Sequence, residues 1–272
     1  MNNRSIGIFD SGLGGLTCVS EMHKLAPREN IIYFGDTARV PYGTRSRETI
    51  LEYAAQDIAL ISDKDVKVVI AACGTVSSAL GDSVPCDLPF FGVVYPAANA
   101  AVRMTRNHII GITGTPATVK SGAYERAIGN GSTYRCVSVA CPLFVPMVEN
   151  GITDPRDTVV RSMVERYLAP IKEHGADTVI LGCTHYPHLE EAIREYMGDD
   201  VVLVSSGAAA ASEALAFLGE TNALTDREQE GSIICYTTDS PEMFYDNAHR
   251  FIGDIPMTVK KITVEQLVGK DH

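Results

Sequence analysis

The chain lacks any long apolar run: no stretch approaches the roughly 18 consecutive apolar residues that a membrane span needs. Its start, from Met1 to Asp10, lacks the apolar core of a secretory signal peptide. Long runs of like charge are also absent, and only 21% of the residues are charged, which argues against a disordered chain. These absences lead us to expect a folded cytoplasmic protein without a membrane partner.

Positive charge is scarce in this chain. It has 23 Lys and Arg residues against 34 Asp and Glu residues, which gives a formal net charge of −11. Proteins that hold nucleic acid through its phosphates need clustered Lys and Arg. We therefore expect no nucleic-acid partner. With 272 residues, of which 45% are hydrophobic, the chain is long enough for one large or two modest domains.

Paired cysteines are missing as well. The seven cysteines are an odd number and form no C-x-x-C motif. This pattern disfavours a disulfide framework, a thioredoxin-type redox site and a zinc ribbon. A free cysteine is by default buried and inert. We expect that default for four of them: Cys18, Cys86, Cys136 and Cys235.

Two segments, Val68–Thr75 and Thr178–His185, carry the strongest signal. Each is an apolar, β-branched run of strand length that stops at a cysteine, with a threonine one or two residues further on. Ligand sites of parallel α/β sheets lie at the carboxyl ends of the strands, so both thiols are placed to reach one site. Two thiols on opposite sides of a bound molecule can remove a proton from one face and return one to the other. We therefore predict that Cys73 and Cys183 invert a carbon centre without a cofactor.

The rest of the chain repeats in the same way. Eight strand-like segments form two series of four in the same order, displaced by a nearly constant interval. The first series is Ile6–Asp10, Ile31–Asp36, Val66–Cys73 and Phe90–Tyr95; the second is Ile109–Gly114, Arg135–Ala140, Asp177–Cys183 and Val201–Ser205. Segments between them, such as Arg45–Asp63 and Asp157–His174, have the apolar spacing of helices.

Strands that alternate with helices indicate parallel sheets covered by helices on both faces. We predict an α/β fold with two similar domains, mostly parallel sheets, a pseudo-twofold relation and the active site in the interdomain cleft. Two further strand-like segments, Ser232–Thr238 and Met257–Thr263, have no counterpart in the repeat, and we expect this tail to return to the first domain. The predicted domains are residues 1–96 with 208–272, carrying Cys73, and residues 97–207, carrying Cys183.

Polar loops follow several of the predicted strands. The first is Asp10-Ser11-Gly12-Leu13-Gly14-Gly15. Gly-rich turns of this kind can cradle a phosphate, but the spacing is not G-x-G-x-x-G and the chain has no G-K-[ST]. Three interpretations stay open: a nucleotide site, an ordinary glycine turn, and a substrate site that uses Asp10 and Ser11.

Two further loops offer hydroxyl and backbone donors. Pro41-Tyr42-Gly43 is either a plain turn or a rigid loop that sets a tyrosine hydroxyl and backbone N–H groups at the cleft. Thr115 and Thr118 follow the strand that begins the second repeat, as Asp10 and Ser11 follow the first. Their hydroxyls are suited to bind a carboxylate.

The Cys183-Thr184-His185 sequence supports a reactive thiol. A neighbouring imidazolium raises the thiolate fraction of a cysteine. The same Cys-x-His pair also fits a metal site, for which only Cys141 and His188 offer further nearby ligands, or a Cys-His hydrolase. A hydrolase would leave the second thiol, Cys73, without a task.

The ordered motifs together resemble the glutamate racemases of the aspartate/glutamate racemase family, which make D-glutamate for peptidoglycan without a cofactor. The resemblance covers nearly the whole chain, and its motifs are specific in their joint order. They are Gly7–Gly15, Tyr33–Gly43, Ala72-Cys73 with Thr75, Gly114-Thr115 with Ala117-Thr118, Pro142-Leu143 with Val145-Pro146, Glu149, and Leu181–Pro187.

The resemblance implies a role for each matching residue. Cys73 would take the α-proton from D-glutamate and Cys183 from L-glutamate, Asp10 and His185 would assist these thiols, and Glu149 would be a further carboxylate near the site. The positions that would line or bind the substrate are Ser11, Pro41, Tyr42, Gly43, Gly74, Thr75, Thr115, Thr118 and Thr184. The family implies no cofactor and no metal, glutamate as the small-molecule partner, and often a homodimer.

Three places depart from the family pattern: Gly74, the segment around Tyr95 and the Ser205-Ser206 pair. The family usually has Cys-Asn-Thr where this chain has Cys73-Gly74-Thr75, and that asparagine contacts the substrate. Without it, another group or a water molecule must replace its hydrogen bonds, or affinity falls. Two alternatives to a glutamate racemase stay open: a two-cysteine racemase for aspartate or a hydantoin, and an inactive relative that only binds a ligand.

Overall fold

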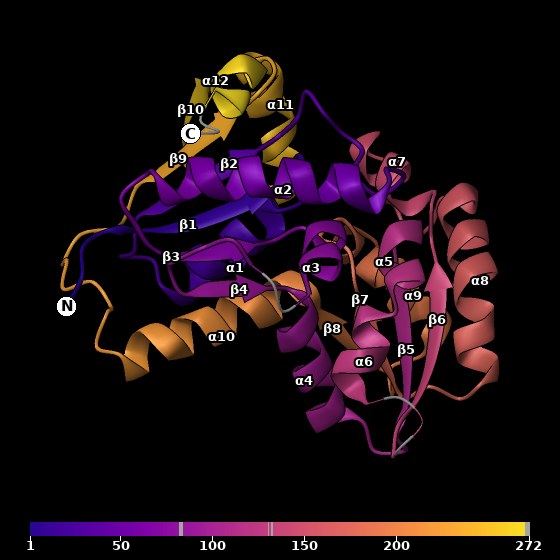
Figure 1. Cartoon of the computed structure of the whole chain (residues 1–272). Helices are drawn as coiled ribbons and strands as arrows, with labels where there is room; N and C mark the ends of the chain where they lie inside the picture. Colours follow the sequence, from indigo (N-terminus) through magenta and orange to yellow (C-terminus); the bar gives the residue numbers. More distant parts are fainter. Residues whose placement is uncertain (82–83, 130, 132, 270–272) are drawn as a thin grey trace.

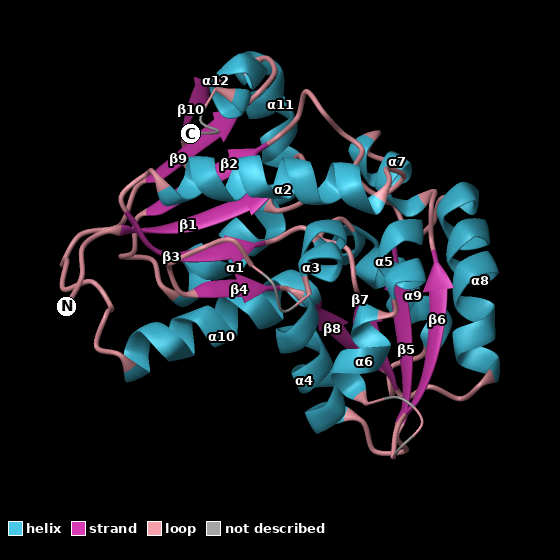
Figure 2. Ribbon diagram, viewed as in Figure 1, coloured by secondary structure: helices cyan, strands magenta, loops and turns pink. Residues whose placement is uncertain are grey.

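The computed structural model describes residues 1–81, 84–129, 131 and 133–269. Residues 82–83, 130, 132 and 270–272 of the predicted domain ranges lie outside the described residues. The described chain contains two parallel β-sheets, and helices flank both of them (Figures 1 and 2). The predicted α/β fold with two helix-covered parallel sheets is confirmed.

The first sheet has the strand order β10-β9-β2-β1-β3-β4. Its strands are β1 (Ser5–Asp10), β2 (Ile31–Gly35), β3 (Val66–Ala71), β4 (Phe90–Gly92), β9 (Ile233–Thr237) and β10 (Thr258–Lys261). The C-terminal strand β9 pairs in parallel with β2, and Ile233 lies opposite Ile31. The tail of the chain therefore extends the sheet that its first residues begin.

The second sheet has the strand order β6-β5-β7-β8. Its strands are β5 (Ile109–Gly114), β6 (Arg135–Ala140), β7 (Thr178–Leu181) and β8 (Val202–Ser205). This order matches the β2-β1-β3-β4 part of the first sheet, strand for strand. The structure thus has the repeat in space that the sequence has along the chain, and β3 corresponds to β7.

Strand β3 shows why these segments are largely apolar, because both faces of its sheet are covered. Its one charged residue, Lys67, is buried and pairs with Glu29. Val68 and Ile70 point into the core that contains α1 (Leu16–Leu25), α10 (Ser206–Glu220) and α11 (Pro241–Ile252). Val69 and Ala71 point into the opposite core, under α2 (Arg47–Ser62) and α12 (Val264–Val268). Alternate residues of a strand face opposite sides, so a strand buried on both sides needs no polar residue.

The second sheet is covered in the same manner. Helices α4 (Val94–Met104) and α6 (Ala123–Ile128) pack on one face with Ile110, Ile112 and Ile180. Helices α8 (Thr158–Glu173) and α9 (Glu190–Met197) pack on the other, which Val179 and Leu181 face. The remaining helices lie near the carboxyl ends of the strands: α3 (Gly74–Leu80), α5 (Pro116–Ser121), α7 (Phe144–Glu149) and the 3-10 helix η1 (Tyr186–Leu189).

The connection between the two repeats differs from the prediction. The sequence predicts a strand through Tyr95, whereas β4 ends at Gly92 and α4 already begins at Val94. Pro96 falls in the first turn of this helix, where a missing backbone N–H costs no intrahelical hydrogen bond. None of the described helices combines the length and the apolar character that crossing a membrane requires.

Candidate active site

A cavity of about 220 Å³ lies among the loops that follow the strands of both sheets. Its wall contains every predicted site residue except Thr118. The predicted residues that line it are Asp10, Ser11, Pro41, Tyr42, Gly43, Cys73, Gly74, Thr75, Thr115, Glu149, Cys183, Thr184 and His185. The structure therefore brings together residues that are dispersed over most of the sequence.

The two cysteines occupy equivalent places in the two sheets. Cys73 follows β3 by two residues, and Cys183 follows β7 by two residues. Both side chains are buried, with exposed fractions of 5% and 7%. A shared cavity that buries both side chains is a setting in which a thiol can exchange a proton with a bound molecule rather than with bulk water.

The Cys73 side of the cavity pairs the thiol with a carboxyl group. The Cys73 thiol donates to Ser11 Oγ, with a sulfur–oxygen distance of 3.6 Å. Burial, together with the nearby charge of Asp10, raises the pKa of Cys73 to about 12. Burial also raises the pKa of Asp10, although the positive charge of His185 and the backbone N–H of Gly12 act against this rise. Both groups on this side therefore hold a proton more tightly than in water.

The Cys183 side carries a chain of three polar groups. The Cys183 sulfur lies 3.7 Å from His185 Nδ1, and His185 Nε2 lies 3.2 Å from Glu149 Oε1. Burial alone lowers the pKa of His185, but the contacts with Cys183 and Glu149 outweigh it and raise this pKa to about 10. His185 is thus an imidazolium at neutral pH, and it donates one N–H to the sulfur and the other to the carboxylate.

Thr118 lies behind the wall rather than in it, which corrects the prediction that it lines the site. It is 1% exposed, and its backbone N–H donates to Thr115 Oγ1 at the start of α5. The two hydroxyls also share a hydrogen bond of 3.0 Å. Thr118 therefore orients Thr115, whose side chain does reach the cavity.

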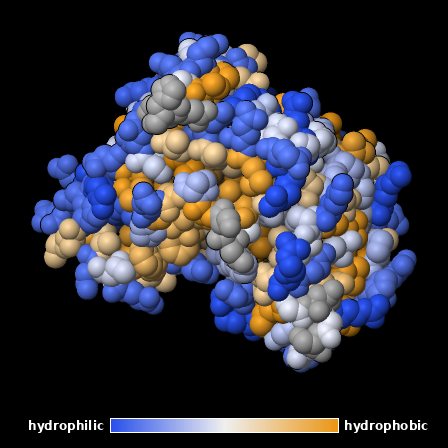
Figure 3. Space-filling model, in the orientation of Figure 1, coloured by the Kyte–Doolittle hydropathy of each residue, from blue (hydrophilic) through white to orange (hydrophobic). Residues whose placement is uncertain are grey.

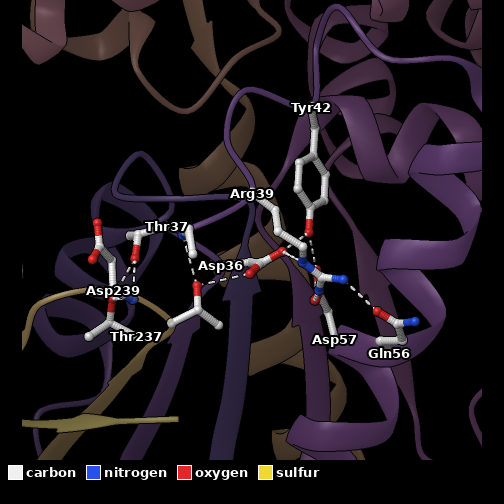
Figure 4. A network of polar contacts seen from close by, with 10 residues as sticks. Asp36, Thr37, Arg39, Tyr42, Gln56, Asp57, Thr237 and Asp239 are labelled. Carbon is white, nitrogen blue, oxygen red and sulfur yellow. Dashed lines mark hydrogen bonds and ion pairs between the residues drawn. The ribbon is translucent and has the colours of Figure 1, made fainter. Parts of the chain in front are cut away.

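The hydroxyl of Tyr42 is directed away from the cavity, which argues against the interpretation in which the Pro41-Tyr42-Gly43 loop sets this hydroxyl at the cleft. Figure 4 shows this hydroxyl among Asp36, Arg39 and Asp57, where it bonds to both carboxylates, at 3.0 Å for Asp57. Arg39 pairs with the same two carboxylates. Burial and the charge of Asp36 raise the pKa of Asp57 well above its usual value, so a proton is retained in this network. The network stabilises the Pro41-Tyr42-Gly43 loop. Tyr42 lines the cavity, but its hydroxyl does not face it.

Gly74 marks a direct contact between the two halves of the site. A Cβ atom added at Gly74 would lie less than 3.0 Å from the carbonyl oxygen of Gly182, a separation that real Cβ atoms essentially never show. The space of the usual asparagine side chain is therefore taken by the backbone next to Cys183. A second contact between the two halves is a hydrogen bond of 3.1 Å between the hydroxyls of Thr75 and Thr115.

Cys141 is a cavity residue that the sequence suggested only as a metal ligand. It lines the cavity, is fully buried, and donates to the carbonyl oxygen of Val139 at 3.5 Å. Its position just after β6 resembles that of Cys73 after β3, and that is the signal by which it could have been found. No three His, Cys, Asp or Glu side chains of the described residues come together as a metal site.

The fold and this two-cysteine cavity agree with what the chain is similar to. The sequence profile of the family described as Asp/Glu/Hydantoin racemase matches residues 6–214, and the chain belongs to that family. It is accordingly an amino-acid racemase, and the predicted family membership is confirmed.

Within this family, the chain is similar to several glutamate racemases over nearly its whole length. The chain is 38% identical over 265 residues to the glutamate racemase of Geobacter metallireducens, which covers 96% of this chain and 97% of that one. It is 39% identical over 267 residues to the glutamate racemase of Bacillus cereus, with 97% and 98% covered. The solved structure of glutamate racemase isoform RacE1 from Bacillus anthracis superposes with a TM-score of 0.90 at 34% identity, over 97% of this chain and 99% of that one. A Francisella tularensis glutamate racemase in complex with D-glutamate gives 0.87 at 33% identity, with 97% and 98% covered.

Proposed function

We propose that this chain interconverts L- and D-glutamate by a two-thiol mechanism without a cofactor. One observation carries the proposal: Cys73 and Cys183 follow equivalent strands of two sheets and line the same cavity. The similarity to glutamate racemases supports glutamate as the substrate rather than aspartate or a hydantoin.

In each direction one sulfur acts as base and the other as acid. The thiolate takes the α-proton and becomes a thiol, while the opposite thiol gives its proton to the other face of the carbanionic carbon and becomes a thiolate. Proton number and charge balance over this step, since one thiol and one thiolate are present before and after it. Cys73 takes the proton of D-glutamate and Cys183 that of L-glutamate.

The neighbours of each thiol affect its protonation. Asp10 and Ser11 influence the equilibrium between the thiol and thiolate forms of Cys73. His185, which is in contact with Glu149, does the same for Cys183. The α-proton is far less acidic than a thiol, so the site must also stabilise negative charge at carbon in a water-poor cavity. The imidazolium of His185 supplies positive charge for this purpose.

The substrate is held by neutral donors. Ser11, Thr75, Thr115 and Thr184 bring hydroxyl groups to the wall of the cavity. Hydroxyl and backbone donors bind the two carboxylates of glutamate without adding fixed charges beside the thiols. Gly74 offers only its backbone, so the hydrogen bonds of the usual asparagine must come from these groups.

The cell-wall role follows as part of the same proposal. The D-glutamate formed here would supply peptidoglycan synthesis. Cys73 and Cys183 are free thiols in the structure, and a mechanism that needs two reduced cysteines fits the reducing cytoplasm.

The test is circular dichroism of L- and D-glutamate with the purified protein, without pyridoxal phosphate or added metal. We expect turnover in both directions, exchange of the α-proton with deuterated solvent, and little turnover of aspartate. Cys73→Ser and Cys183→Ser should each lower kcat by at least about 10³-fold, because loss of the acid or base removes a whole catalytic step. Cys86 does not line the cavity, so Cys86→Ser is the matched control and should keep full activity. Absence of glutamate turnover, or its loss on adding a chelator, would refute the proposal.

A further inference from the structure

The loop that joins β1 to α1 touches the Thr184-His185 segment of the second repeat at Gly14. A Cβ atom added at Gly14 would lie less than 3.0 Å from the imidazole of His185 and from the hydroxyl oxygen of Thr184. The nearest imidazole atoms are Nδ1 and Cε1, and Nδ1 is the nitrogen that faces the sulfur of Cys183. The absent side chain of Gly14 therefore leaves the space that this edge of the imidazole occupies.

Thr17, in the first turn of α1, ties the same loop to the same segment. Its hydroxyl lies 2.9 and 3.0 Å from the carbonyl oxygens of Gly14 and Thr184 and shares its proton between them. Thr17 is 8% exposed and Thr184 is 2% exposed, so the bond lies in a low dielectric, where a hydrogen bond is stronger than in water. Thr184 stands between Cys183 and His185, and this bond therefore holds the backbone that carries both side chains.

The loop is fixed on both sides of Gly14. Before it, the buried hydroxyl of Tyr33 donates to the carbonyl oxygen of Gly12 at 2.7 Å, and the backbone N–H of Gly12 donates to Asp10 at 2.9 Å. After it, the backbone N–H of Thr17 donates to the carbonyl oxygen of Gly14 at 3.0 Å. A loop with these bonds is a rigid support for the imidazole that lies against it.

Packing elsewhere between the two repeats is less directional. Helix α3 packs against both α2 and α5, and Figure 3 shows apolar residues, in orange, at the surface around α3. Apolar burial is non-directional, so by itself it does not orient one polar group against another. A close backbone approach and a hydrogen bond do, and Gly14 and Thr17 provide both at the imidazole.

The protonation of His185 reports the position of its ring. Burial lowers the pKa of His185, but the contacts of its two nitrogens with Cys183 and Glu149 raise this pKa to about 10. The other titratable or charged groups around it are Asp10, His188 and Arg250, which bonds to the carbonyl oxygen of Glu149. An imidazole that moves away from Cys183 stays buried but loses one of its two contacts, so its pKa falls.

We propose that Gly14 and Thr17 are positioning residues of the racemase reaction, which hold the imidazole of His185 against the sulfur of Cys183. The inference rests on the proposed two-thiol function, in which His185 serves the proton transfer of Cys183. Neither positioning residue is among the described residues that line the substrate cavity, so both act through His185. The first repeat thus carries Cys73 and also orients the acid–base group beside the cysteine of the second repeat.

The test compares Thr17→Val, which keeps the shape of the side chain without its hydroxyl, with Thr17→Ser, which keeps the hydroxyl. Racemisation of glutamate by the full chain is followed by circular dichroism, and the titration of His185 by nitrogen NMR of the chain labelled at histidine. His185→Gln identifies the His185 signal. We expect Thr17→Val to lower kcat by about 10-fold, part of the roughly 10²-fold that a misplacement of about 1 Å costs, with little change in KM. The pKa of His185 should fall below about 10 in Thr17→Val, and Thr17→Ser should keep both values.

Gly14→Ala tests the other contact. Its Cβ would push Nδ1 and Cε1 of the imidazole away from Cys183, so kcat should fall by about 10²-fold and the pKa of His185 should fall further than in Thr17→Val. Two controls are matched to these variants. Thr178→Val removes a buried hydroxyl that bonds to Asp177 at 3.0 Å, at the opposite end of β7, and Gly219→Ala adds a Cβ that meets nothing closer than 4.0 Å. Both should keep the parental kcat and the parental pKa of His185, even where the unfolding free energy changes.

The proposal is wrong if Thr17→Val and Gly14→Ala keep the parental kcat and the parental pKa of His185, or if they lose only unfolding free energy. It is equally wrong if kcat falls as much in Thr17→Ser as in Thr17→Val, or if kcat falls while the pKa of His185 stays the same. Should Gly14→Ala fail to fold, the pair of Thr17 variants still decides. The NMR titration needs no turnover, so failure of the proposed function, seen as a parent chain that does not racemise glutamate, is distinguishable from failure of this inference.

Discussion

The contact between Gly74 and Gly182 predicts a large effect from a single methyl group. In Gly74→Ala the new Cβ would come closer than 3.0 Å to the carbonyl oxygen of Gly182. The opposing atom belongs to the backbone, so no side-chain rotation relieves the clash. Gly74 adjoins Cys73 and Gly182 adjoins Cys183, and any relief therefore separates the two thiols.

The expected size follows from how far the backbones must move. An ordinary contact begins near 3.4 Å, so α3 and the end of β7 must part by on the order of 1 Å. A misplacement of about 1 Å costs roughly 10²-fold in rate, whereas overpacking of a closed core costs about 1–3 kcal/mol of stability. Because the contact lies at an interface beside a cavity, we expect the strain to appear mainly as lost alignment. We predict a fall in kcat/KM of about 10- to 100-fold. The unfolding free energy should fall by about 1 kcal/mol, the lower end of the range for overpacking.

The assay combines racemisation followed by circular dichroism with urea unfolding of the same sample. Gly219→Ala is the matched control, since its Cβ would meet nothing closer than Leu224 Cδ1 at 4.0 Å. A helical Gly→Ala change with free space stabilises by up to about 1 kcal/mol and should leave kcat and KM unchanged. Gly74→Asn, which restores the usual family residue, carries the same Cβ and should be impaired as well. Parental kcat, KM and unfolding free energy in Gly74→Ala would refute the reasoning, because the two backbones could not then be in contact in the active protein.

Four other substitutions test the polar groups. The pKa of His185 is raised from 6.5 to about 10, so its contribution to stability is complete below pH 6.5 and is lost as pH rises through about 10; the difference in unfolding free energy between the parent chain and His185→Gln should shrink over that range. Burial, with the charge of His185, lowers the pKa of His188 to about 4, so the difference for His188→Gln should instead shrink as pH falls from 6.5 toward 4. Glu149 is 40% exposed, so Glu149→Gln should lower kcat/KM by only about 10-fold while shifting its alkaline limb to lower pH, as a pH–rate profile would show. Tyr42→Phe removes one of the donors to two buried carboxylates and should cost about 1–3 kcal/mol in urea unfolding with KM unchanged, whereas Tyr53→Phe should alter neither value; a raised KM in Tyr42→Phe would return its hydroxyl to the substrate site.

The sequence was sufficient for the fold because strands buried on both faces leave a clear record. Runs such as Val68–Ala71 and Val179–Leu181 are apolar and buried at every position, and a cysteine follows each run by two residues. The order of these runs predicted the repeated strand order of the two sheets. It also predicted that the thiols meet at the carboxyl ends of the strands, where the structure places one cavity.

The direction of individual side chains could not be predicted from the sequence. Nothing in Pro41-Tyr42-Gly43 shows that the tyrosine hydroxyl turns toward Asp57, fifteen residues further on in α2. Likewise, the motif shows that Gly74 lacks a side chain, but only the fold shows that a backbone carbonyl lies in its place.

The duplicated unit explains why there are two thiols, but not why their neighbours differ. Cys73 lies beside a buried carboxyl group, and its raised pKa means that it rests as the thiol. Cys183 lies beside an imidazolium, which is itself held by Glu149. A two-base racemase needs one thiol and one thiolate at the same moment, and identical surroundings would favour the same form at both sulfurs. Under the proposed mechanism the resting Cys73 thiol is therefore the acid for L-glutamate, and it must lose its proton before it can act as the base for D-glutamate.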